Sequence, residues 1–164
     1  MQKLISLTFV VVLLTLFLGC AGSSASSGGG SKIYRANLGI ATFSGLRDQT
    51  QRLLVNKHHY IIQYFDESTD RFYVETEWKD RSPFADEVQQ GVLQARSRVI
   101  LEGRPRIHAG RSSKLKIKFR GENLLLFSDS GQWERGHMSK QARENFKELA
   151  NELKHRFSTM VREF

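Results

Sequence analysis

The segment from Lys114 to Arg120 alternates strictly between basic and apolar side chains, and this pattern constrains the fold more than any other feature of the chain. Successive side chains of a β-strand point to opposite faces of a sheet. Leu115, Ile117 and Phe119 therefore share one face, and four basic residues share the other. We expect a sheet with one face in water and one apolar face that other parts of the chain must cover.

Several further segments have the composition or alternation of strands. Residues 58–65 are rich in β-branched and aromatic residues, and a polar turn joins them to an alternating segment at 71–79, which predicts a hairpin. Residues 92–104 alternate between an apolar and a basic set, and the apolar run 124–127 extends the segment that starts at Lys114 or begins a fifth strand. The sequence predicts an antiparallel sheet of four or five strands.

Two segments have the apolar spacing of helices. Ser44 is the expected N-cap of a helix that runs to about Asn56, and Ser139 is the expected N-cap of a helix that runs to Arg162. The apolar stripe of the second helix consists of Ala142, Phe146, Leu149, Ala150, Leu153, Phe157, Met160 and Val161. We predict a two-layer α+β domain in which the shorter N-terminal helix and the long C-terminal helix pack on one face of the antiparallel sheet.

The N-terminus has the organisation of a secretory signal. Lys3 precedes a mostly apolar run at residues 4–18, which is short for a membrane span, and Gly19 and Cys20 follow it directly. This segment resembles the precursor of a bacterial lipoprotein, in which a small residue precedes the cysteine of the lipobox. The resemblance implies that residues 1–19 are a cleaved signal peptide, and that Cys20, the only cysteine of the chain, becomes acylated and anchors the protein to a membrane.

A spacer and one domain follow the cysteine. The Gly- and Ser-rich composition of residues 20–32 predicts a flexible linker that reaches roughly 15 to 20 Å, and residues 33–164 are expected to form a single domain. Ala21 stands where lipoproteins kept in the inner membrane of enteric-type bacteria carry Asp. The resemblance thus implies an outer-membrane protein that faces the periplasm.

Basic residues are the best candidates for binding. The formal net charge is +8, which favours an anionic partner or surface. Six candidates share the expected wetted face of the sheet: Arg96, Arg98, Lys114, Lys116, Lys118 and Arg120. This face either only keeps the domain soluble or binds an anionic lipid or an acidic patch of an envelope protein. Nucleic acid is not an expected partner, because the signal peptide directs the chain out of the cytoplasm and interleaved aromatic residues are missing.

The sequence contains no recognisable catalytic or metal-binding motif, and we expect neither catalytic residues nor a metal or cofactor. Adjacent His58 and His59 are interpreted as one half-buried and one solvated residue rather than a metal pair. Glu75 and Glu77 share a face on which they could chelate a cation, but cross-strand ion pairs with Arg96 or Arg98 are the expected interaction. Trp78 is expected to anchor the core, and Trp133 lies in a loop where it could contact a partner.

The order of these elements, with Asp66, Asp70 and the sequence Thr76-Glu77-Trp78 in the hairpin, resembles the small α+β domains of outer-membrane assembly lipoproteins. These include the lipopolysaccharide-assembly partner lipoprotein and lipoprotein subunits of the outer-membrane protein insertion machine. The resemblance implies a non-enzymatic accessory or assembly role at the cell envelope. The alternatives are a structural interaction module without a specific ligand and an envelope hydrolase without a recognisable motif.

Overall fold

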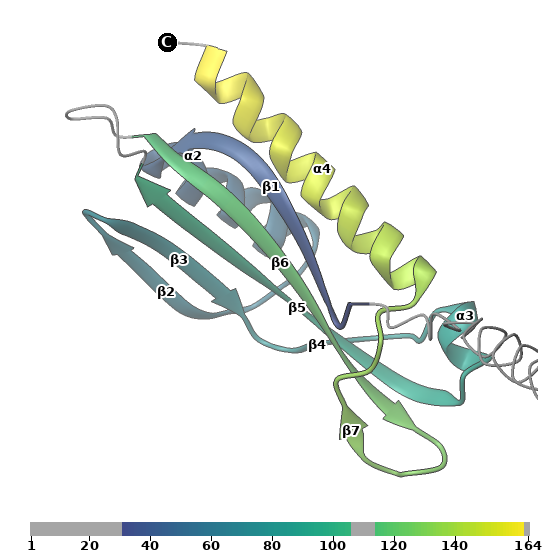
Figure 1. Cartoon of the computed structure of the whole chain (residues 1–164). Helices are drawn as coiled ribbons and strands as arrows, with labels where there is room; N and C mark the ends of the chain where they lie inside the picture. Colours follow the sequence, from purple (N-terminus) through teal and green to yellow (C-terminus); the bar gives the residue numbers. More distant parts are fainter. Residues whose placement is uncertain (1–30, 106–113, 163–164) are drawn as a thin grey trace, which may run out of the picture.

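A computed structural model describes residues 31–105 and 114–162 of the chain. The predicted signal peptide, the proposed lipid attachment at Cys20 and the linker up to residue 30 lie outside the described residues. In the described part, an antiparallel sheet forms one layer and helices on one of its faces form the other (Figure 1). This confirms the predicted two-layer α+β class.

The elements follow one another in this order: β1 (Ile33–Thr42), α2 (Phe43–Gln49), η1 (Thr50–Lys57), β2 (Ile62–Ser68), β3 (Arg71–Thr76), β4 (Lys79–Arg81), α3 (Ala85–Val88), β5 (Val92–Pro105), β6 (Lys114–Phe127), β7 (Trp133–Glu134) and α4 (Lys140–Arg162). The sheet has seven strands, where the sequence predicted four or five. Their path is β1-β6-β5-β3-β2, while β4 pairs with β5 and β7 pairs with β6. The added strands are β1, which was not predicted, and the short β4 and β7.

Strand β1 escaped prediction although its first half alternates. Tyr34 and Ala36 face the core, whereas Arg35 and Asn37 lie opposite Arg120 and Lys118 of β6. The register then shifts at Gly39, whose φ of 95° is readily adopted only by glycine. The bulge breaks the alternation, so a single period does not fit the whole strand.

The N-terminal helix forms in the predicted segment, but its N-cap residue differs from the predicted one. Thr42, not Ser44, is the N-cap, because its hydroxyl accepts a hydrogen bond from Gly45 N at 3.1 Å. The helix then continues as the π-helix η1 and ends beside His58, so that β2 begins at Ile62 rather than at residue 58. Leu46 and Leu54 are fully buried, which fixes this helical segment on the sheet.

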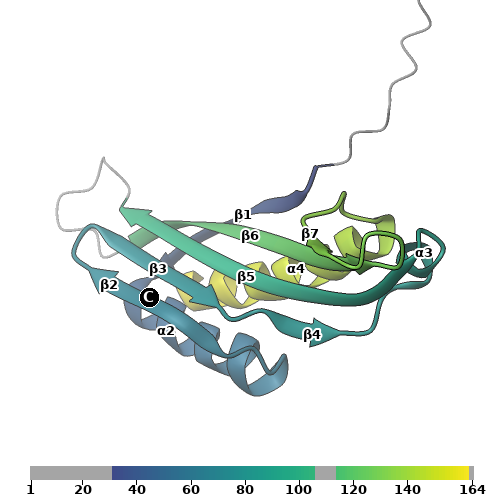
Figure 2. The ribbon, with the colours of Figure 1, turned by 90° about the horizontal axis from the view of Figure 1, so that it is seen from below.

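The C-terminal helix forms as predicted. Ser139 caps it, since Ala142 N donates a hydrogen bond to the Ser139 hydroxyl at 3.1 Å. In Figure 2 strands β5 and β6 pass in front of α4, whose buried stripe faces the sheet. A Cβ atom added to Gly121 would lie 2.4 Å from Cδ1 of Phe146, so the helix approaches β6 closely at this glycine.

Strand β5 follows the predicted parity except at its beginning. A bulge between Val92 and Gln94 places Val92 in the interior and leaves Leu93 59% exposed, where the parity predicted Leu93 in the core. Ala95, Ser97, Val99 and Leu101 are buried as predicted. The bulge thus exposes one large apolar side chain at the end of the sheet next to α3.

Candidate functional site

The six predicted basic residues lie on one face of the sheet, the face turned away from the helices, which we call the outer face. The register places Arg98 opposite Glu122 and Arg96 opposite Leu124, while Ser97 and Asn123 between them are buried on the other face. The structure therefore brings the predicted set together on one surface. It does not leave all six charges equally accessible.

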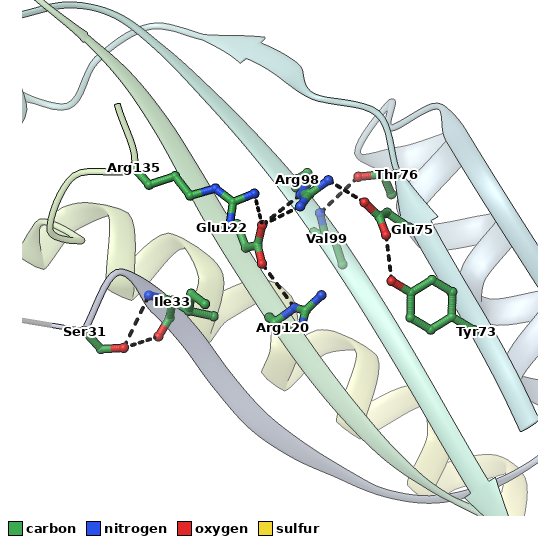
Figure 3. Close-up of polar contacts among 10 residues, drawn as sticks. All are labelled: Ser31, Ile33, Tyr73, Glu75, Thr76, Arg98, Val99, Arg120, Glu122 and Arg135. Atoms are coloured by element: carbon green, nitrogen blue, oxygen red, sulfur yellow. Dashed lines mark hydrogen bonds and ion pairs between the residues drawn. The ribbon is translucent and has the colours of Figure 1, made fainter. Parts of the chain in front are cut away.

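Arg98 is held between two carboxylates. Its Nε donates a hydrogen bond to Glu122 Oε2 at 2.8 Å, and its Nη1 forms an ion pair with Glu75 from strand β3 (Figure 3). The expected ion pair between Glu75 and Arg98 is thus present, whereas Glu77 is exposed and forms no ion pair with the described residues. Trp78 stacks under this guanidinium, with its ring centre 4.6 Å from Arg98 Cζ, and so it does not anchor the core as predicted. Its position follows from β3 ending at Thr76, after which the strand parity no longer applies.

Glu122 is the centre of this network. Its side chain is 5% exposed, and its carboxylate oxygens form ion pairs with three arginines. Oε2 pairs with Arg98 and, at 4.0 Å, with Arg135 Nη2, and Oε1 lies 3.2 Å from Arg120 Nε (Figure 3). One buried carboxylate thus partly neutralises three guanidinium groups, which makes them structural rather than freely available charges.

The network continues to Tyr73 on β3. The Tyr73 hydroxyl donates a hydrogen bond to Glu75 Oε2 at 2.6 Å. Burial raises the pKa of Tyr73 above its ordinary value, and this hydrogen bond raises it further. Tyr73 thus remains a neutral donor that orients Glu75 towards Arg98.

Arg96 is also engaged. Its Nε donates a hydrogen bond to Asp80 Oδ1 at 2.6 Å, and its Cζ lies 4.3 Å from the ring centre of Trp133. The indole predicted to be free for a partner is therefore already stacked on an arginine of the same chain. Arg96 and Arg98 together tie β4, β7 and the edge of β3 to the central strands.

A groove of about 410 Å³ opens on the outer face, and we call it the outer-face groove. The residues that line it are Arg35, Ala36, Asn37, Tyr73, Ile100, Glu102, Lys118, Phe119 and Arg120. Buried Ile100 contributes an apolar surface, and three of the charged lining residues are basic against one acid. This composition suits a ligand that combines an anionic group with a small apolar portion.

Sequence reasoning missed Arg35 because β1 was not predicted. The alternation of Arg35 and Asn37 with Tyr34 and Ala36 was the available signal for a strand. In the observed register Arg35 lies opposite Arg120. Arg35 is exposed and belongs to the groove, whereas predicted Arg96 and Arg98 do not line it.

The three predicted lysines are exposed along β6. Lys118 lines the groove, Lys116 is the next outward residue, and Lys114 lies opposite Thr42 of β1. Within residues 31–105 and 114–162, neither Lys116 nor Lys118 forms an ion pair. Their charges are therefore the most accessible part of the predicted patch.

The histidine pair lies in the loop after η1, on the helix side of the sheet. His58 is half-buried, with its Nε2 3.0 Å from Glu152 Oε2, and His59 is exposed, as expected for a pair that does not share a metal. Lys57 donates a hydrogen bond to Glu152 at 2.5 Å, and this contact is the main reason that the pKa of Glu152 is lowered. His58 also lines a second cavity of about 470 Å³ between η1, β4 and α4.

Within the described ranges, no cluster of three or more His, Cys, Asp and Glu side chains has the arrangement of a metal site. In the same part of the chain, no helix combines the length and hydropathy needed to cross a bilayer. Comparison with family models, with curated proteins and with solved structures finds no match to this chain.

Proposed function

We propose that this protein is a non-enzymatic bacterial lipoprotein, anchored through Cys20 to the periplasmic side of the outer membrane, whose domain binds an anionic group of an envelope partner in the outer-face groove. The observation that carries the proposal is the groove itself, which brings exposed Arg35 and Lys118 of two neighbouring strands beside Arg120, whose charge Glu122 partly neutralises. The accessory role implied by the resemblance to assembly lipoproteins is consistent with such a binding site.

The charge balance supports the groove rather than the whole outer face as the binding surface. Arg96 and Arg98 are engaged by carboxylates and indole rings, so they serve the fold. Lys118 lacks an ion pair among the described residues, and neighbouring Lys116 adds a further accessible charge. Glu102 is the one acid that lines the groove, and it forms an ion pair with Arg104 at 2.6 Å. The groove thus keeps a net positive potential that attracts anions.

The engaged arginines favour a second candidate for the remainder of the outer face. Charges that pair with one another hold strands together and keep the domain soluble, which is the structural-module alternative. The two candidates differ in one measurable respect. If the groove is a specific site, the affinity for an anion depends on the position of a removed charge. If the outer face is a structural module, the affinity depends on the net charge alone.

Charge reversal separates the two candidates. The double variant Arg35→Glu with Lys118→Glu removes two cations from the groove, and Arg52→Glu with Lys154→Glu is the matched control on exposed helical positions. With the lipidated protein in neutral phosphatidylcholine nanodiscs, we expect the groove variant to bind tripolyphosphate and a tetra-aspartate peptide about tenfold more weakly, and the control to change by less than about twofold. Equal losses in both variants would support the structural module.

The anchor has its own test. Mass spectrometry of the protein from membranes is expected to show an acylated N-terminal Cys20, and Cys20→Ala is expected to abolish both processing and acylation. An unprocessed chain of 164 residues recovered from wild-type cells would contradict the proposed location.

A further inference from the structure

One end of the domain brings the start of the described chain next to α3 and the beginning of α4. Met138 N donates a hydrogen bond to Ser31 O at 3.4 Å, which places the first described residue beside the N-terminus of α4. Gln141 N then donates to Asp86 Oδ2 at 2.9 Å, which joins α4 to α3. Figure 1 shows α3 and the starts of β1 and α4 at this end, while the β2–β3 turn lies at the opposite end.

This end also exposes two large apolar side chains. Val88, the last residue of α3, is 57% exposed, and Leu93, displaced by the bulge at the start of β5, is 59% exposed. A short turn joins them, because Gly91 N donates a hydrogen bond to Val88 O at 3.0 Å. The other large apolar residues with high exposure, Ile61, Tyr64 and Phe65, belong to β2 and the residue before it.

We propose that this end of the domain rests on the anchoring membrane, with Val88 and Leu93 inserted into the headgroup region. The inference rests on the proposed acylation of Cys20. That cysteine stands eleven residues before Ser31, a distance that even a fully extended chain limits to about 40 Å. The tether therefore attaches at the end that carries the two exposed apolar side chains, and this end meets the bilayer first.

The charges at this end fit the same contact. Exposed Lys32 and Lys140 lie one residue after Ser31 and two residues after Met138, whose backbones are hydrogen-bonded. Lysines near a membrane surface are attracted to anionic lipid headgroups, and apolar side chains beside them enter the interface. Apolar insertion next to a short tether converts a loosely attached domain into an oriented one.

The orientation has a consequence for the outer-face groove. Leu93 lies level with Leu126 of β6, because the flanking residues Val92 and Gln94 pair with Phe127 and Leu126. Of the groove residues on β6, Arg120, which lies opposite Arg35, stands six residues further along the strand and Lys118 eight, which corresponds to about 20 and 26 Å. In the proposed orientation, with β6 upright on the bilayer, this height exceeds the length of about 8 Å over which physiological salt screens charges, and headgroups of the anchoring bilayer do not act on the groove. Its anionic ligand therefore belongs to a partner above the membrane surface.

Site-specific fluorescence tests the orientation directly. Because Cys20 is the only cysteine and is acylated in the proposed protein, each added cysteine can be labelled alone with an environment-sensitive dye. The test variants are Val88→Cys and Leu93→Cys; Ile61→Cys is the control of matched exposure, and Thr69→Cys marks the opposite end. The lipidated protein is reconstituted in vesicles of phosphatidylethanolamine and phosphatidylglycerol that contain spin-labelled lipids.

We expect quenching at positions 88 and 93 to be about threefold stronger than at positions 61 and 69. If the protein floats with the vesicles but all four labels are quenched equally or not at all, the proposed orientation is wrong, whereas the proposed lipid anchor is still supported. If the protein does not float and carries no acyl chain, the proposed anchor itself fails. A label at position 118 that is quenched as strongly as that at 93 would overturn the separation between groove and membrane.

Discussion

Replacing Glu122 by glutamine changes the charge at the centre of the outer-face network without changing the shape of the side chain. Glu122 is almost fully buried and accepts contacts from Arg98, Arg120 and Arg135. The amide of glutamine can accept a hydrogen bond through its oxygen, but its NH₂ group faces guanidinium donors. Glu122→Gln therefore leaves three cations close together with one carboxylate fewer.

The structure indicates how large the effect should be. Removing one partner of a buried ion pair costs about 3 to 5 kcal/mol. Arg98 keeps its second carboxylate, Glu75, and Arg120 and Arg135 are 40% and 56% exposed and can turn to water. We therefore expect the lower end of the range, a decrease of about 3 kcal/mol in the free energy of unfolding.

The same substitution should strengthen anion binding. One negative charge removed at roughly 7 Å from a bound anion changes the interaction by about 0.6 kcal/mol in water, which is about threefold in affinity. Glu102→Gln is the matched control, because Glu102 lines the groove and its ion pair with Arg104 is exposed. We expect Glu102→Gln to give the same gain in affinity and a loss of stability below about 1 kcal/mol.

Urea unfolding followed by circular dichroism measures the stability, and titration with tripolyphosphate measures the affinity. The slope of the unfolding free energy against urea should stay unchanged, so that the midpoint alone reports the loss. If Glu122→Gln and Glu102→Gln lose equally little stability, Glu122 is not the centre of a buried network. If neither variant binds tripolyphosphate more tightly, the groove is not the anion site.

Two further predictions concern the helix side of the sheet. Gly121→Ala places a methyl group against the buried ring of Phe146, and the overpacking should cost about 1 to 3 kcal/mol in urea unfolding; Phe146→Leu in the same chain should recover part of this loss, and an additive double variant would contradict the close approach. The lowered pKa of Glu152, caused chiefly by the hydrogen bond from Lys57, means that its carboxylate stabilises the fold above its ordinary pKa of 4.5 and that this contribution is lost as the pH falls through the lowered value. Glu152→Gln should therefore reduce the melting temperature near neutral pH, with a difference from the parent that narrows below about pH 4; a difference that is constant with pH would contradict the assignment.

The elements that sequence analysis predicted well are those whose pattern repeats over many residues. The apolar stripe of α4 from Ala142 to Phe157 and the alternation in β5 and β6 each predict one buried face, and the structure buries that face. The wrong predictions concern positions where a bulge or the end of a strand interrupts the alternation of side chains. The bulge at Gly39 interrupts β1, the bulge at Val92 exposes Leu93, and the end of β3 at Thr76 turns Trp78 to the outer face. Strands as short as β4 and β7 offer no period to detect.

The candidate site was predictable in outline, because strand parity alone places the basic residues of β5 and β6 on one face. Which of these charges remain accessible was not predictable, since that depends on which strands are neighbours and in what register. Glu75 and Glu122 lie 23 and 24 residues from Arg98 in sequence, on the strands at either side of β5. Only the strand order β6-β5-β3 places both carboxylates beside the same guanidinium.

On the outer face the arginines of β5 form ion pairs, whereas Lys116 and Lys118 remain accessible, and this difference follows from the chemistry of the two side chains. A guanidinium presents several donors in a plane, so Arg98 can bind two carboxylates and stack on Trp78 at once. An ammonium group is a compact, strongly hydrated charge, and Lys116 and Lys118 stand in water without a carboxylate partner among the described residues. A charge reversal at Arg98 would therefore place a third acid between Glu75 and Glu122 and unfold the sheet before it reported on binding. Loss of ligand binding with an intact fold can be expected only from the groove residues Arg35 and Lys118 and from their neighbour Lys116, and these residues define the surface on which the function should be tested.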